Sequence, residues 1–194
     1  MRTRMKTVLE YPRWVLIEMF RVSIYYLMAS MSAPFWIKLQ GQLLDKNTLA
    51  GIMLLSSVSG TLAFLLKNIS FEKKYNFIFW YVIIENILTI IFLPELETSA
   101  VVFGLSIIGS LMSMVIGSYV VDYDGLMSQQ VPELFKDILY YEKFFFGTAA
   151  IMGGTIAVLI PNATIAFLIL AISGFFQAYL IILNKKELRN EGII

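Results

Sequence analysis

Long apolar runs separated by short polar stretches are the main feature of the sequence. Each run has about 17–24 residues, close to the ~20 residues that an α-helix needs to cross the hydrocarbon core of a bilayer. Backbone polar groups in hydrocarbon must be paired inside the protein, which favours helices over irregular segments. The pattern predicts an all-α, polytopic membrane bundle of six transmembrane helices, at about residues 14–37, 48–66, 75–93, 100–121, 144–160 and 163–183.

The longest polar interruption is the stretch 122–143, which reads DYDGLMSQQVPELFKDILYYEK. A segment with this many charges does not lie in hydrocarbon, so it places the chain outside the bilayer between the fourth and fifth helices. We expect a loop there, with a short amphipathic helix at residues 132–141.

The positions of Lys and Arg predict the orientation of the helices. If the N-terminus is inside the cell, twelve of these residues fall in inner segments, whereas Lys38 and Lys46 alone fall in outer ones. Cytoplasmic segments carry the excess of Lys and Arg. The sequence therefore predicts a multi-pass protein of the cell membrane with both termini cytoplasmic, a basic leader at residues 1–13 and a tail at residues 184–194.

Composition narrows the possible functions. The 194 residues are 58% hydrophobic, against roughly 45–50% in soluble domains. The sequence has no Cys and no His, which excludes disulfides, thiol nucleophiles and imidazole bases and removes the commonest zinc ligands. It also lacks a glycine-rich phosphate loop and a nucleophile paired with a base. We therefore expect neither an enzyme nor a metal or cofactor site, and the net charge of +1 gives no indication of a nucleic-acid partner.

Three charged residues fall within the predicted spans: Glu18, Arg21 and Glu85. A charge at the centre of a bilayer is unfavourable by about 2.5–3.5 kcal/mol on insertion scales, so such residues suggest function. Glu18 and Arg21 are three residues apart and near the inner surface, where they form either a juxtamembrane ion pair or part of a site. Glu85 is midway along its helix and is either held neutral by hydrogen bonds or is a candidate for proton coupling.

Small residues recur at helical spacing on three helices, which allows backbones to approach closely in lipid. They serve either packing within the chain or contact with a partner. The candidate helix-interface residues are Ser56, Gly60, Gly109, Gly117, Gly153 and Gly154.

Aromatic residues have two expected roles. Trp14 and Trp36 flank the first helix and are predicted to anchor it at the two membrane surfaces. Tyr25 and Tyr26, in the middle of the same helix, either line an adaptable apolar cavity or pack against lipid and neighbouring helices.

Several motifs in chain order resemble one six-helix half of a major facilitator superfamily transporter. Arg13-Trp14 leads into a long first helix that ends in Ala33-Pro34-Phe35-Trp36, similar to the proline-containing outer end of the family's first helices. Gly60-Thr61-Leu62-Ala63 and the pair Lys73-Lys74 are similar to the family's inner-loop motif, although Phe64 stands where its aspartate is expected. The segment 128–133 resembles the family's link between helices four and five, with Lys136-Asp137 in place of arginine-glycine.

This resemblance implies that helices one and four line a substrate cavity, that helices two and five meet a second half, and that helices three and six are peripheral. Glu85, on helix three, fits this arrangement less well. The substrate or cavity residues that the resemblance implies are Glu18, Arg21, Tyr25, Tyr26, Ser106, Ser110 and Ser113.

The sequence thus suggests a half-transporter, divisible into two three-helix repeats, that moves a small organic solute across the lipid bilayer. A complete transporter of that family has two halves, so we expect a dimer with a second copy or with another six-helix half. The alternative is a membrane subunit without transport activity, which binds substrate for a separate module, or an immunity-type protein that occupies a target.

Overall fold

The computed structural model describes residues 11–194, which form six α-helices, two short 3-10 helices and no strand. The predicted basic leader lies outside the described residues, apart from its last three positions. The helices are α2 (Arg13–Leu43), α3 (Lys46–Thr61), α4 (Phe71–Ile91), α5 (Ser99–Gln130), α6 (Phe135–Ala157) and α7 (Ala163–Asn190), with η1 (Leu62–Leu66) after α3 and η2 (Leu93–Glu95) after α4.

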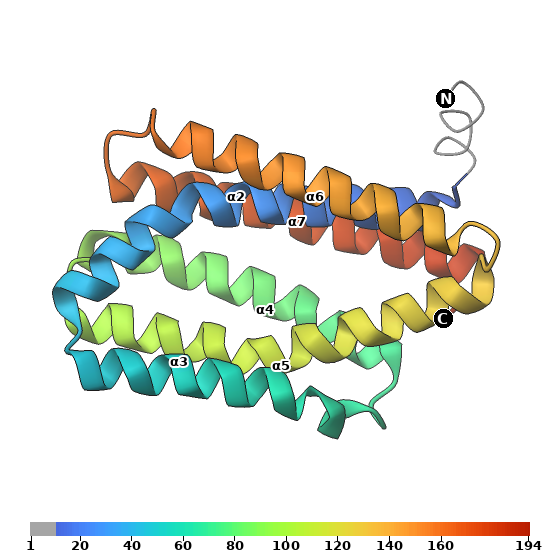
Figure 1. Cartoon of the computed structure of the whole chain (residues 1–194), viewed down its shortest axis with the longest axis horizontal. Helices are drawn as coiled ribbons and strands as arrows, with labels where there is room; N and C mark the ends of the chain where they lie inside the picture. The colour runs from blue at the N-terminus through green and yellow to red at the C-terminus, as the bar shows by residue number, and fades with distance from the viewer. Residues whose placement is uncertain (1–10) are drawn as a thin grey trace.

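The helices form two layers, as Figure 1 shows, with α2, α6 and α7 in one and α3, α4 and α5 in the other. Successive helices run in opposite directions, so α2 begins and α7 ends at the same end of the bundle. In the first layer α2 packs against both α6 and α7; in the second, α5 packs against α3. Contact between α4 and α7 joins the layers.

The end of the bundle at which α2 begins and α7 ends is called here the basic end. The described segments there carry nine Lys and Arg residues, whereas the opposite end has Lys38 and Lys46. The nine are Arg13, Lys67, Lys73, Lys74, Lys136, Lys143, Lys185, Lys186 and Arg189.

Helix ends coincide with capping side chains at two tight turns. The Asp45 carboxylate accepts hydrogen bonds from the backbone N–H groups of Asn47 at 2.9 Å and Thr48 at 3.0 Å, which starts α3. The Thr48 hydroxyl also donates to Asp45, and these bonds hold the pKa of that carboxyl below its usual value. At the α6–α7 hairpin, Asn162 accepts from the N–H of Ile165 at 3.0 Å, as a helix N-cap residue does.

The polar stretch is largely helical: residues 135–141 of the expected short helix are helical as part of the longer α6, whereas most of the remaining stretch, expected as loop, belongs to α5. Helix α5 continues through Gln130 and α6 begins at Phe135, so just four residues between them are outside a helix. The ends of both helices bury Tyr123, Met127 and Ile138 in an apolar cluster at the basic end. Because one side of each helix end packs on this cluster, the helices extend while their charged residues occupy the other side.

Five of the six helices, with α3 extended through η1, are long and apolar enough to cross a membrane, which indicates a membrane protein. The exception is α6, because its first nine residues include Lys136, Asp137, Glu142 and Lys143. Its apolar part begins after these charges, at residue 144, as the sequence pattern predicts.

Candidate functional site

A cavity of about 660 Å³ lies inside the bundle and is lined by residues of all six helices. At the basic end its wall includes Glu18 and Tyr119, and at the opposite end it includes Trp36, Gln40 and Phe167. The cavity therefore extends along much of the bundle axis. Most of the exposed area of its wall is apolar, and each helix also contributes at least one polar side chain.

Glu18 and Arg21 form a buried ion pair on α2. Arg21 donates from Nε to Oε2 of Glu18 at 2.9 Å and from Nη2 to Oε1. Two more donors reach this carboxylate from other helices: the Tyr119 hydroxyl of α5 at 2.8 Å and the Asn184 amide of α7 at 3.2 Å. Glu18 is only 2% exposed, so the pair is held inside the protein and ties three helices together.

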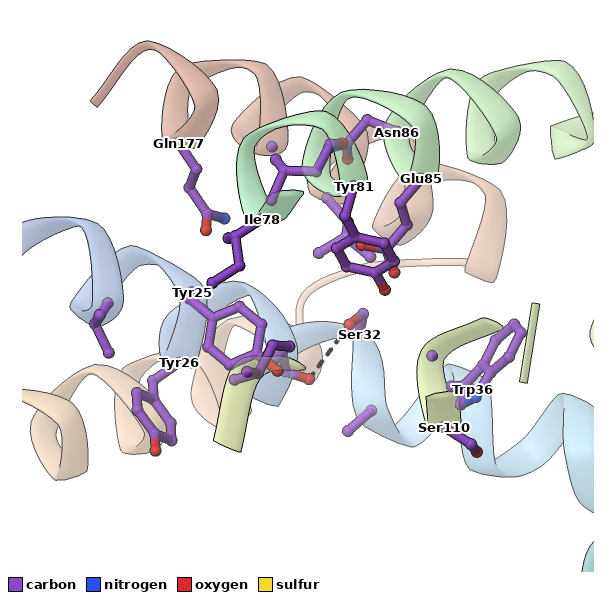
Figure 2. A pocket seen from close by; sticks show the side chains of 18 of the residues that line it. Tyr25, Tyr26, Ser32, Trp36, Ile78, Tyr81, Glu85, Asn86, Ser110 and Gln177 are labelled. Atoms are coloured by element: carbon purple, nitrogen blue, oxygen red, sulfur yellow. Dashed lines mark hydrogen bonds between the residues drawn. The ribbon is translucent and has the colours of Figure 1, made fainter. Parts of the chain in front are cut away.

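Glu85 lies on the cavity wall contributed by α4, and its neighbours are aromatic. Figure 2 shows Glu85 and Tyr81 of α4 and Tyr25 of α2 projecting into the same space. Within residues 11–194, Glu85 forms no salt bridge with Lys or Arg. Within this part of the chain, no basic side chain therefore neutralises its carboxyl.

Gln177 of α7 is a further polar group on the wall. Its side chain points into the cavity beside Ile78 (Figure 2) and is only 5% exposed. None of the described side chains or backbone groups makes a hydrogen bond to its amide within the usual limits, so both ends of this amide are open to a bound molecule.

The chemistry of the cavity has to be inferred from these side chains. No known protein family, curated protein or solved structure matches the chain. A mainly apolar space between helices, with convergent polar groups on its wall, is typical of a binding site for a small organic molecule. In the part of the chain that the structure describes, no group of three or more acidic side chains is placed to hold a metal ion.

Two acidic residues line the cavity close to the basic end, Asp124 on α5 and Glu142 on α6. Glu142 precedes the apolar part of α6 and is buried. Burial, together with the charges of Asp124 and Glu18, raises the pKa of Glu142 from 4.5 to about 7. This carboxyl group therefore changes its charge near neutral pH.

Most of the predicted cavity residues line this space, including the pair Glu18 and Arg21. Ser113 is not among them: its hydroxyl donates to the Ser56 carbonyl at 3.3 Å and to the Ser110 carbonyl at 2.7 Å, so it links α5 to α3. Glu85, which fitted the family resemblance less well, lies on the wall. The predicted residues that line the cavity are Glu18, Arg21, Tyr25, Tyr26, Ser106 and Ser110.

The candidate interface glycines fall into different environments. A Cβ atom at Gly153 would lie 2.1 Å from the Leu27 carbonyl oxygen, so α6 and α2 meet there within the chain. At Gly117 a Cβ would make ordinary contact with Ala63, at 3.4 Å. No atom of another element lies within 4 Å of a Cβ built at Gly60, Gly109 or Gly154.

Of the two tryptophans of α2, Trp14 does not take its predicted role as an anchor at the membrane surface, because it is buried. Trp14 is buried against Tyr123, with ring centroids 5.7 Å apart, because the extended α5 covers it. Trp36 lines the cavity and packs edge-on against Phe167 at 5.6 Å. Contacts between helices far apart in the chain therefore decide where both side chains lie.

Sequence reasoning missed Tyr81, Gln177 and Gly174. A Cβ at Gly174 would lie 2.0 Å from the Asn86 amide nitrogen, so this glycine admits Asn86 between α4 and α7. Gln177 could have been found as a polar residue inside the apolar run FLILAISGFFQAYLIIL. Tyr81 could not, because nothing in its local sequence separates it from the tyrosines that pack elsewhere.

Proposed function

We propose that the chain is a half-size membrane transporter that moves a small organic solute as a dimer. The observation that supports this best is the cavity of about 660 Å³ lined by all six helices. A solute site between helices of a bundle, near the middle of the membrane, is typical of secondary transporters.

The arrangement of helix pairs supports an inverted repeat. Exchange of α2 with α5, α3 with α6 and α4 with α7 converts the contact α2–α6 into α5–α3 and leaves the contact α4–α7 unchanged, whereas the extensive contact α2–α7 has a smaller counterpart in α5–α4. The exchanged helices run in opposite directions (Figure 1). Two three-helix repeats of inverted orientation are a feature of each half of major facilitator transporters, so this pattern agrees with the resemblance in the sequence.

The exposure of the cavity wall supports a dimer. Tyr25 and Tyr26 both line the cavity, yet they are 49% and 41% exposed. In the opposite layer, Met53 of α3 and Val120 of α5 also line the cavity and are exposed. A second copy placed over this side would cover the cavity, and a parallel two-fold dimer gives both halves the same orientation in the membrane.

Transport can be tested in liposomes that contain the purified protein. Labelled tetraethylammonium, benzoate and glucose serve as cationic, anionic and neutral probes, with and without an imposed pH gradient. We expect saturable uptake of at least one probe, dependence of that uptake on the gradient, and loss of this dependence in Glu85→Gln. The exposed Glu97→Gln is the matched control and should behave as the wild type. Uptake no faster than in protein-free liposomes for all three probes would contradict transport.

A further inference from the structure

The cavity wall carries more acidic than basic side chains. Four carboxyl groups and one guanidinium line the space, those of Glu18, Glu85, Asp124, Glu142 and Arg21. The guanidinium of Arg21 is directed to Glu18 by two hydrogen bonds, and this pair is neutral as a unit. The charge left over is therefore acidic, and it includes Glu85 in the middle of the cavity.

The neighbours of Glu85 suit a positive charge. Tyr81 is one turn away on α4, and Tyr25 faces it from α2 (Figure 2). Aromatic faces attract cations through the ring quadrupole, most strongly where water is excluded. Farther along the same cavity, beside Ile78, the buried Gln177 amide of α7 adds an acceptor oxygen that has no hydrogen bond to the described residues (Figure 2).

The size and composition of the site favour an organic cation over a metal ion. Ca²⁺ takes six to eight oxygen ligands and Mg²⁺ demands near-octahedral coordination, whereas residues 11–194 bring no three acidic side chains together for such an ion. The cavity wall as a whole is instead mainly apolar in its exposed area, with Val82, Leu170 and Phe146 among its members. An apolar body with one positive charge matches both properties.

We infer that the cavity takes a lipophilic organic cation, with its positive charge beside the Glu85 carboxylate and the rings of Tyr25 and Tyr81. This inference names the substrate class of the proposed transporter and rests on that function for its biological sense. The occupant is recognised by one counter-charge and by apolar contact, so the site excludes anions of the same size.

Binding to the purified full-length protein in detergent tests the inference without any measurement of flux. Tetraphenylphosphonium and tetraphenylborate serve as probes, because they have nearly the same size and shape and opposite charge. Equilibrium dialysis, corrected for binding to protein-free micelles, should show saturable binding of tetraphenylphosphonium and none of tetraphenylborate. Equal binding of the two ions, or no saturable binding of the cation, would overturn the inference.

Variants assign the binding to this site. Glu85→Gln should weaken tetraphenylphosphonium binding by about tenfold or more, as expected for a cation that loses a desolvated counter-charge. Tyr25→Leu should weaken it less, and Glu97→Gln should leave it unchanged. An affinity in Glu85→Gln equal to that in Glu97→Gln would refute the site. Binding is measured apart from transport, so the two hypotheses can fail separately. Tight binding of the cation without uptake in liposomes contradicts only the proposed transport. Uptake of another probe without cation binding contradicts only this inference.

Discussion

The hydroxyl of Tyr119 on α5 donates a hydrogen bond to Oε1 of Glu18 on α2 at 2.8 Å. This contact links the two layers of the bundle through a buried carboxylate. Arg21 and Asn184 complete the same cluster. A carboxylate with this many donors is satisfied in the folded protein, which accounts for two charged side chains in a predicted membrane span.

Loss of Arg21 should destabilise the bundle, since it leaves a buried carboxylate without its counter-charge. We expect Arg21→Met to lower the free energy of unfolding by about 3–5 kcal/mol. The double variant Glu18→Gln/Arg21→Met should recover most of this loss, because the carbonyl oxygen of the introduced amide still accepts from Tyr119 and Asn184. Thermal unfolding of the wild type and both variants in detergent measures whether the double variant is more stable than Arg21→Met. Arg21→Met as stable as the wild type would contradict the role of the pair.

The close approach of α6 to α2 at Gly153 can be tested with an adjacent glycine as control. In Gly153→Ala the new methyl group meets the Leu27 carbonyl, and we expect a loss of about 1–3 kcal/mol from the forced separation of the helices. Gly154→Ala adds the same methyl group where no atom of another element is within 4 Å. Its unfolding temperature should equal or exceed that of the wild type. Equal effects of the two substitutions would show that α6 does not pack on α2 in this register.

The charge of Glu142 should make stability depend on pH. Its pKa is about 7 in the folded protein against 4.5 as the ordinary value, so the folded state retains a proton that the unfolded chain releases. Stability should therefore fall as pH rises from about 4.5 to about 7 and then level off. Burial is the largest cause of this raised pKa, and the charges of Asp124 and Glu18 add to it.

Unfolding temperatures of Glu142→Gln across this pH range check the assignment. The variant should be flatter than the wild type, whereas Glu133→Gln, at an exposed position between α5 and α6, should keep the slope. A wild-type slope that survives in Glu142→Gln would assign the titration to another group.

The proposed dimer can be tested by disulfide crosslinking, because the chain has no native Cys. Leu54 of α3 is 66% exposed and Ile151 of α6 is 73% exposed, so both side chains are free to meet a second copy. In membranes, Leu54→Cys/Ile151→Cys should give a crosslinked species of twice the monomer mass. Leu54→Cys/Ile172→Cys, with its second Cys on α7, should remain monomeric. Monomer alone in both variants, with uptake intact, would exclude a dimer joined at this face.

The helices were predictable from the sequence because each apolar run is about as long as a helix that crosses the hydrocarbon core of a bilayer. In hydrocarbon a helix is the structure in which such a run pairs its own backbone polar groups. The extension of α5 and α6 into the polar stretch was not, since it depends on Met127 and Ile138 packing on an apolar cluster formed by distant residues. Likewise, the charges at Glu18, Arg21 and Glu85 could be recognised as unusual, but their surroundings come from other helices. Whether Gln177 of α7 and Tyr81 of α4 face the cavity depends on how each helix is rotated about its axis. Packing between helices sets this rotation, and the local sequence does not show it.

Transport through this cavity requires that solutes reach it from both sides of the membrane, which the accessibility of Ser110→Cys measures. Ser110 lies on the cavity wall, whereas Ile172 of α7 is on the outer surface and does not line the cavity. A membrane-impermeant thiol reagent, added to sealed vesicles of either orientation, should label Ser110→Cys in both and Ile172→Cys in neither. Labelling of Ser110→Cys from one side only, or no faster than Ile172→Cys, would contradict transport through this cavity.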